Sequence, residues 1–381
     1  MSDNNSDHFY LENTFPEPDK IFSFDYKGID EIVKDCVFVF DTNVLLVPFD
    51  TSSKNISEIK RIFKDLKGKN QLYLPARVAR EFAKNRGKKL GELFLKIRQT
   101  KNQLNSGHFK VDDYPLLENH SEFKKLKKTF EKGVSIVKQA REQLDNIESL
   151  IKGWTWNDNV SNMYTEIFTP DIIIEVKKTE DELVKDLEFR SKHSIAPGYN
   201  DKNKTDGGIG DLIIWNTILE LGSALKKDIV FVTDDQKNDW FYKQDKESLY
   251  PKFELFDEYR RATNGKSIHL LSFPEFLLRL NAKEETIAEV KESIERGNAS
   301  QYSRSYNHND LIEGMEVEHK RFGKGTVKRL YLSSAGKEWI EIDFENGVSK
   351  NFILKYCDLH IPDSFDNALL KFFNDSSESN D

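Results

Sequence analysis

The chain has 381 residues, enough for one large domain and a smaller one. With 38% hydrophobic and 32% charged residues, it has no apolar run near the roughly 18 residues that a membrane-spanning helix needs. The formal net charge of −8 excludes a surface that is positive throughout, so any polyanion has to be bound by a local patch. A cytoplasmic globular protein is therefore expected, and its two cysteines, Cys36 and Cys357, have no Cys or His neighbours at the spacing of a zinc site.

Strand and helix patterns alternate along the first part of the chain. A polar segment, residues 1–20, lacks the apolar run of a signal peptide and precedes a strand pattern at Val37–Phe40 that ends on Asp41. Apolar residues at helical spacing from Ile56 to Leu66 predict a helix. A short strand pattern ended by proline follows at Gln71–Pro75, and then a second helix pattern begins. This order is typical of a sheet with covering helices.

Residues 86–195 differ in composition from what precedes them. They are rich in Lys, Glu and Gln, with apolar residues three and four apart, which predicts a long helical insertion. The lysines between residues 124 and 128 could bind phosphates, although mixed charge on a helix is more typical of a solvated face. Trp154 and Trp156 could stack on bases, but packing of the insertion against the main domain is the commoner use of tryptophan.

The strand and helix alternation resumes after the insertion. Asp211 opens an apolar helix pattern, where a carboxylate ordinarily serves as an N-terminal cap. A strand pattern at Ile229–Thr233 leads directly into Asp234 and Asp235, and a further strand at Ile268–Leu271 precedes a short helix. Strands that alternate with helices form parallel sheets, so residues 21–281 are predicted to be an α/β domain with a Rossmann-like parallel sheet.

The last part of the chain predicts a separate, smaller domain. Residues 282–310 combine a charged helix with a linker rich in Gly, Asn and Ser. Residues 311–362 hold short strands in which apolar and polar positions alternate, with a hairpin turn at Asn346-Gly347, and they predict a small all-β barrel. The tail, residues 363–381, is acidic and serine-rich at its end, where disorder is expected.

Carboxylates are the chemically informative side chains of this sequence. Nucleotide-binding and serine-hydrolase motifs are absent from it. Two buried strands end on acids, and the carboxyl ends of parallel strands share the edge where such sheets bind ligands. Carboxylates that converge there would repel one another unless a hard divalent cation, Mg²⁺ or Mn²⁺, neutralised them, and such a site suits phosphodiester hydrolysis. The candidate acids are Asp41, Glu81, Asp211, Asp234, Asp235 and Asp239.

Four motifs carry a resemblance to a known family. In order and setting, Phe40–Leu45, Glu81, Gly210–Trp215 and Val232–Trp240 resemble the PIN-domain nucleases, in particular the PIN-like subgroup with a long helical insertion. The resemblance implies a Rossmann-like sheet with an acidic pocket that binds Mg²⁺ or Mn²⁺ and cleaves nucleic acid by metal-activated water. RNA is favoured as the substrate, and DNA stays open.

The resemblance also implies roles for single residues. The catalytic, metal-binding carboxylates would be Asp41, Glu81, Asp211 and Asp235. Asp235 is preferred to Asp234 because the family pattern is Thr, any residue, Asp. Asp239 would be an additional metal ligand, and Asp234 would have a supporting role. Of the other two supporting residues, Asn43 would position the first acid, and Thr233 would position the phosphate by hydrogen bonding.

A second resemblance lies near the carboxyl end. Residues 314–327, together with residues 342–347, resemble the Tudor-like barrel of helicases related to UvrD and PcrA. In those proteins this barrel implies docking onto nucleic acid or the transcription machinery, so a protein partner is also expected. The glycines serve tight turns between strands in either case. The expected nucleic-acid contacts are Lys320, Arg321, Lys324 and Lys328.

Two other functional classes stay open on the sequence. One is a catalytically inactive PIN-like module that binds nucleic acid or protein. The other is a phosphatase of the haloacid-dehalogenase type, which also begins with a strand-end aspartate but needs a second acid where Asn43 stands. Oligomeric state is open as well, and a toxin-like or phage-defence role is an expectation from the family alone.

Overall fold

The structure is a computed structural model of the whole chain. It describes residues 8–23, 25–199, 207–235, 239–244, 247–302, 311–319, 321–333, 337–345, 347–354, 357 and 359–361. The chain divides into two compact units: the first is formed by Met1–Ala79 and Pro170–Asp381, and the second by Arg80–Thr169. No helix in the described ranges is both long enough and apolar enough to cross a membrane.

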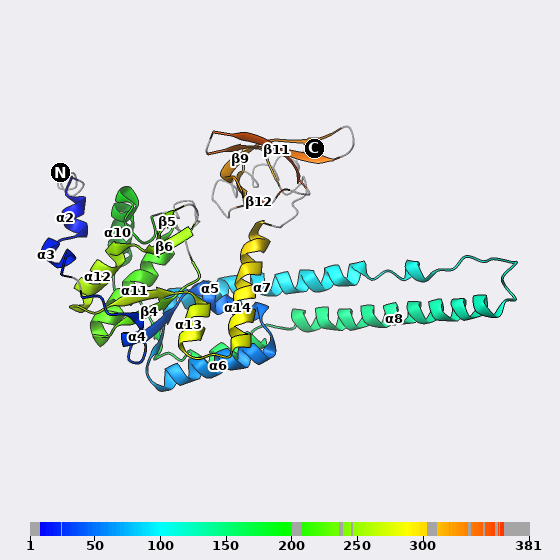
Figure 1. Ribbon diagram of the computed structural model, residues 1–381, viewed down its shortest axis with the longest axis horizontal. Helices are drawn as coiled ribbons and strands as arrows, with labels where there is room; N and C mark the ends of the chain where they lie inside the picture. The colour runs from blue at the N-terminus through cyan, green and yellow to red at the C-terminus, as the bar shows by residue number, and fades with distance from the viewer. Residues whose placement is uncertain are drawn as a thin grey trace. The chain divides into compact units, whose positions relative to one another are not determined.

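The first unit contains a five-stranded parallel sheet in the order β3-β2-β1-β4-β7. Its strand β4 is labelled in Figure 1. Neighbouring strands β1 and β4 are buried at every position, as expected for parallel strands covered on both faces. Their register aligns the last residues of both strands, Phe40 with Val232. The strands are β1 (Val37–Phe40), β2 (Leu72–Pro75), β3 (Ile173–Ile174), β4 (Ile229–Val232) and β7 (Ile268–Leu271).

Helices cover both faces of this sheet. On one face, Phe40 of β1 contacts Phe63 and Phe276, with ring centroids 4.7 and 5.1 Å apart. On the other, Phe231 of β4 contacts Trp240, which packs edge-on against Trp215. The main helices of this unit are α6 (Ser53–Gly68), α10 (Glu180–His193), α11 (Ile209–Leu225), α12 (Phe253–Thr263), α13 (Phe273–Arg279) and α14 (Glu284–Tyr302). The predicted α/β class is therefore confirmed.

Shorter elements complete this unit. The described part of the N-terminal segment includes the short helices α2 to α4, and another helical turn follows β1. A two-stranded antiparallel ribbon lies between β4 and α12. These elements are α2 (Tyr10–Thr14), α3 (Pro18–Ile21), α4 (Ile29–Ile32), α5 (Thr42–Leu46), the 3₁₀ turn η1 (Val47–Asp50), β5 (Phe241–Gln244) and β6 (Glu247–Pro251).

The second unit is a long helical hairpin. It contains most of α7 (Ala76–Gln103), then η2 (Ser106–Phe109), α8 (Ser121–Lys152) and α9 (Asn159–Ile167). The Arg98 guanidinium on α7 lies 3.4 Å from the Glu148 carboxylate on α8, so the two helices are tied side by side. The unit ends at Thr169, whereas the predicted insertion extends to residue 195, because α10 belongs to the unit that holds the sheet.

A five-stranded antiparallel sheet lies near the carboxyl end, in the order β11-β10-β9-β8-β12. It curls around its own apolar core, which includes Val327, Ile340 and Ile342. The sheet is an open half-barrel, consistent with the small all-β part that the sequence predicts. Its strands are β8 (Glu316–His319), β9 (Gly323–Leu332), β10 (Glu338–Phe344), β11 (Ser349–Ile353) and β12 (Leu359–His360).

The segment 282–310 is described only in part. Helix α14 begins at Glu284 and continues to Tyr302, since one glycine at position 297 is not enough to end a helix. Asn346, residues 303–310 of the predicted linker and the tail 363–381 lie outside the described residues.

Candidate functional site

Asp41 lies where the buried strand β1 ends and α5 begins. Its backbone is extended, and its Oδ1 atom accepts a hydrogen bond of 2.6 Å from the N–H of Thr42, which makes it the N-cap of α5. Its own N–H donates to the carbonyl of Val232 at the end of β4, 3.0 Å away. The pairing of β1 with β4 therefore places Asp41 beside the residues that follow β4.

Two polar side chains hold the second oxygen of this carboxylate. The Thr233 hydroxyl donates to Oδ2 of Asp41 at 2.7 Å, and the Asn43 amide donates to the same atom at 2.9 Å. The same side chains also accept hydrogen bonds from the turn after β4. Asn43 Oδ1 accepts from the N–H of Asp234 at 3.2 Å, and the Thr233 hydroxyl accepts from the N–H of Asp235 at 3.0 Å. The first acid and the Asp234–Asp235 turn thus form one network.

The environment of Asp234 in this network perturbs the pKa of its carboxyl group. Burial raises its pKa to about 6, and the negative charges of Asp41 and Glu275 act in the same direction. A hydrogen bond from the N–H of Phe273 to Oδ1, 2.9 Å long, opposes this rise. Its Oδ2 atom is buried and accepts no hydrogen bond from the described residues. Among the described residues, the end of β4 therefore carries more negative charge than its neighbours neutralise.

The other candidate acids occupy different settings. Asp239 is fully buried, and its Oδ2 atom accepts a hydrogen bond from the N–H of Gly198 at 3.3 Å. Asp211 is half-buried and is the third residue of α11, whose N-cap is Gly208, so it lies in the first turn of the helix and not at the N-cap position. The backbone of Gly208 has φ +83°, which favours glycine at the cap position. Glu81 lies on α7 in the second compact unit.

The structure adds one acid that the sequence analysis did not consider. Glu275 stands close enough to Asp234 for its charge to raise the pKa of that carboxyl group. It is the third residue of α13, where its side chain accepts hydrogen bonds from the backbone and hydroxyl of Ser272 in a capping box. The Ser-x-x-Glu pattern at residues 272–275 is the signal that could have indicated it.

The donor atoms around Asp41 fit a hard divalent cation. They are carboxylate, hydroxyl and amide oxygens, which Mg²⁺ and Mn²⁺ prefer. The buried Oδ2 atom of Asp234 supplies negative charge that such an ion would neutralise. No three His, Cys, Asp or Glu side chains within the described ranges come close enough together to hold a metal ion. Mg²⁺ commonly binds through one or two carboxylates and several waters, so the residues present suit that mode.

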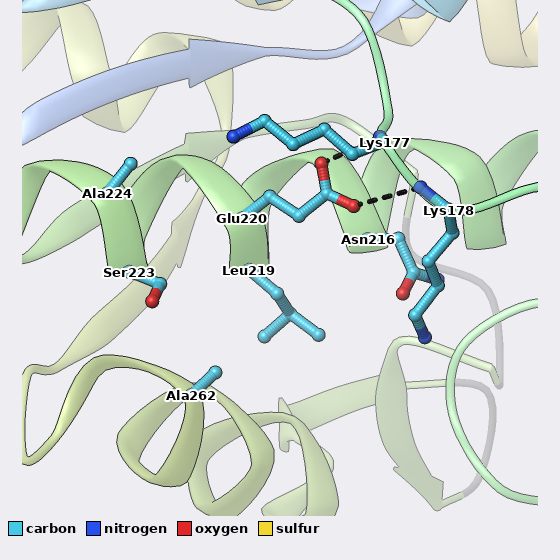
Figure 2. A pocket seen from close by; sticks show the side chains of 8 residues that line it. All are labelled: Lys177, Lys178, Asn216, Leu219, Glu220, Ser223, Ala224 and Ala262. Atoms are coloured by element: carbon cyan, nitrogen blue, oxygen red, sulfur yellow. Dashed lines mark hydrogen bonds between the residues drawn. The ribbon is translucent and has the colours of Figure 1, made fainter.

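Two cavities lie apart from these acids. One, of about 470 Å³, is lined by residues of α11, α12 and the segment before α10 (Figure 2). There the Glu220 carboxylate accepts hydrogen bonds from the N–H groups of Lys177 and Lys178, at 2.8 and 3.3 Å. The other, of about 500 Å³, lies at the amino ends of the strands and is lined in part by Lys34 and Lys69. Neither lining includes a candidate acid.

The predicted contact residues of the C-terminal sheet differ in which groups surround their charged side chains. Lys328 is ion-paired with Glu341 at 2.9 Å and approaches Asp343 at 3.6 Å. The Arg321 guanidinium lies over the ring of Phe322, 5.5 Å from its centroid. Lys324 is exposed on β9, and Lys320 lies outside the described residues.

Comparison with known proteins agrees with this architecture. A family model described as a PIN-like domain matches residues 37–255, from the first residue of β1 into α12, which is more than half of the chain. No curated protein matches the chain. The match includes strands β1 to β4 of the sheet, among them the two that position Asp41 and the turn after β4, and the chain therefore belongs to the PIN-like domain family.

Proposed function

We propose that this protein is a divalent-metal-dependent nuclease that hydrolyses phosphodiester bonds of nucleic acid, with RNA favoured over DNA. The observation that carries the proposal is the carboxylate of Asp41, which three donors fix at the carboxyl edge of the sheet beside the turn after β4. Membership of the PIN-like domain family supports it, since PIN-like domains are usually nucleases.

In this proposal Asp41 and Asp235 would hold the metal, and Glu81, Asp211 and Asp239 would be the further acids that the family resemblance implies. A bound Mg²⁺ or Mn²⁺ supplies an activated water and neutralises charge on the attacked phosphate. The chain's own contribution is orientation. Donors on both oxygens of Asp41 hold the carboxylate in one rotamer, so little reorganisation is needed when the substrate binds.

The C-terminal sheet has a targeting role in this proposal. It would act as a Tudor-like module that docks onto nucleic acid or a protein partner, in a cytoplasmic setting. The exposed side chains of Arg321 and Lys324 support contact with a polyanion. Lys328 contributes less, because two neighbouring carboxylates already balance its charge.

The decisive test is cleavage by the Asp41→Asn variant. Purified protein is incubated with Mn²⁺ and a panel of labelled single- and double-stranded RNA and DNA. Asp41→Asn keeps the shape of the side chain but removes its charge, so we expect the cleavage rate to fall on the order of a hundredfold or more. The matched control is Asp35→Asn, an exposed acid before the opposite end of β1, which should cut at the parental rate.

Two outcomes would contradict the proposal. One is an Asp41→Asn variant that cuts as fast as the parent. The other is a parent that binds nucleic acid but cuts none of the panel with either metal, which would favour the inactive PIN-like binding module.

A further inference from the structure

Positive charge is unevenly distributed between the two compact units. The unit Arg80–Thr169 holds 17 Lys and Arg against 12 Asp and Glu, a formal charge of +5. The whole chain has −8, so the rest of the chain carries −13. A protein that binds a polyanion needs a local positive surface, and this unit is where the chain concentrates it.

A row of lysines runs along the solvent side of α8. Lys124, Lys128 and Lys132 are exposed and follow one another at intervals of four residues, so they lie on one ridge of the helix. The face of α8 that contains Phe123 and Val137 is buried and points away from this ridge. Ammonium groups so spaced are separated by about 6 Å along the helix axis. We call these three residues the lysine ridge.

The charges of the lysine ridge are not balanced by ion pairs. Within the described residues no carboxylate pairs with any of its three ammonium groups, whereas neighbouring lysines on the same helix are paired. Lys125 lies 2.7 Å from Glu122, and Lys127 lies 2.7 Å from Asp113. Glu131 is the acid of α8 next to the ridge, so the ridge keeps an excess of positive charge.

The hairpin presents this ridge on a rigid support. Phe109 of η2 packs against Gly133 so closely that an added Cβ would lie 2.3 Å from its ring. The buried Arg86 on α7 donates to Asp158 at 3.0 Å and to Ser161 at 2.7 Å, which ties α7 to α9. A charged row on a braced helix loses less conformational freedom on binding than one on a loop.

We infer that the lysine ridge binds the phosphate backbone of the nucleic acid on which the proposed nuclease acts. The inference rests on the proposed function for the identity of the polyanion. Charge complementarity favours it, because the ridge holds three unbalanced positive charges on the one unit of this acidic chain that is net positive. Phosphate contacts of this kind position a strand without reading its sequence.

The test compares two triple variants of the full chain in the Asp41→Asn background, so that the strand stays intact. The ridge variant carries Lys124→Gln, Lys128→Gln and Lys132→Gln. The control carries Lys69→Gln, Lys185→Gln and Lys291→Gln, which remove the same charge from exposed positions outside both the hairpin and the C-terminal sheet. Binding of labelled single-stranded RNA and DNA is measured by fluorescence anisotropy over a series of salt concentrations, and circular dichroism checks that the helices persist.

Each phosphate contact on a single strand contributes about 0.7 to the slope of log affinity against log salt, so the loss of three contacts should reduce that slope by about 2. At about 0.1 M salt, the ridge variant should bind on the order of a hundredfold more weakly than the parent. The control should keep the parental slope. An unchanged slope and affinity in the ridge variant, or equal losses in both variants, would overturn the inference. A ridge variant that loses affinity while the parent cleaves nothing would leave the inference standing and count against the nuclease function instead.

Discussion

The side chain of Thr233 joins the two halves of the candidate site. Its hydroxyl donates to Oδ2 of Asp41 and accepts from the N–H of Asp235, so one oxygen atom links acids that are 194 positions apart in the chain. The sequence predicts both strand-end acids, because each follows a short apolar run. It could not predict this link, since hydrogen bonds between side chains depend on the register of β1 with β4.

The Thr233→Val variant tests this link at the scale of one residue. Valine keeps the volume of the buried threonine but removes all the hydrogen bonds of its hydroxyl, so the Asp41 carboxylate loses a donor that orients it. Loss of a group that orients a metal ligand typically costs about 10- to 100-fold in metal affinity or activity, and we expect a decrease of this size in cleavage at limiting Mn²⁺. The control is Thr217→Val, an equally buried threonine whose hydroxyl bonds the carbonyl of Ile213 within α11. Similar rates in both variants would contradict the proposed role of Thr233.

At the scale of elements, the helices of the hairpin depend on a buried ion pair. Arg86 and Asp158 are about nineteen-twentieths buried, and the Arg86 guanidinium also covers the ring of Trp156, 4.7 Å from its centroid. Burial works against ionisation of Asp158, but hydrogen bonds from Ser161 and Arg86 outweigh it and lower the pKa of the carboxyl group below its usual value. Trp156 therefore packs within the hairpin unit itself.

The Asp158→Asn variant should destabilise this unit, because the buried guanidinium of Arg86 loses its counter-charge. Breaking a buried pair from one side costs roughly 3–5 kcal/mol. Since the folded-state pKa is lowered, the stabilisation by Asp158 is present above the unfolded pKa of about 3.9 and is lost as pH falls through the folded value. Urea unfolding followed by tryptophan fluorescence at pH 7 and below pH 4 measures both effects. Asp145→Asn, which removes a half-exposed partner of Lys101, should cost about 1 kcal/mol or less. Equal losses in the two variants would contradict the importance of the buried pair.

The pattern of the sequence predicts the helices better than it predicts which unit they join. Apolar spacing indicates α6, whose buried residues form one stripe, and α8, where Phe123, Val137 and Ile151 are buried. The same spacing does not show what a stripe packs against. Helix α10 looks like a continuation of the insertion, yet its Arg190 pairs with Glu258 of α12 at 2.6 Å and so joins the unit with the sheet.

At the scale of the whole molecule, net charge conceals the feature that matters for a polyanion. The net charge of −8 is the sum of +5 on the unit Arg80–Thr169 and −13 on the rest of the chain. Composition alone excludes a uniformly basic protein but gives no information on this partition, which needs the limits of the compact units. The fold class was accessible from the sequence because strands that alternate with helices allow few arrangements, and the short alternating strands after residue 311 allow a small curled sheet.

Metal binding is a property of the whole native state and can be measured as a change in its stability. A ligand that binds the folded chain but not the unfolded one raises the free energy of unfolding by about 2.7 kcal/mol at a concentration a hundred times its Kd. For a domain of about 150–250 residues, this increase in the free energy of unfolding raises Tm by roughly 5–10 °C. We therefore expect millimolar Mg²⁺ or Mn²⁺ to raise the Tm of the parent and to leave that of the Asp41→Asn, Asp235→Asn double variant unchanged.

A matched double variant distinguishes a specific site from general screening of an acidic surface. Asp35→Asn with Asp65→Asn removes two exposed carboxylates and the same amount of charge, so it should keep the parental response to the metal. If differential scanning fluorimetry gives equal metal-induced shifts in all three proteins, the ion acts by screening the net charge of the chain. If the parent shows no shift, then the carboxylates around Asp41 hold no cation, and the excess negative charge at Asp234 has to be balanced by protonation instead.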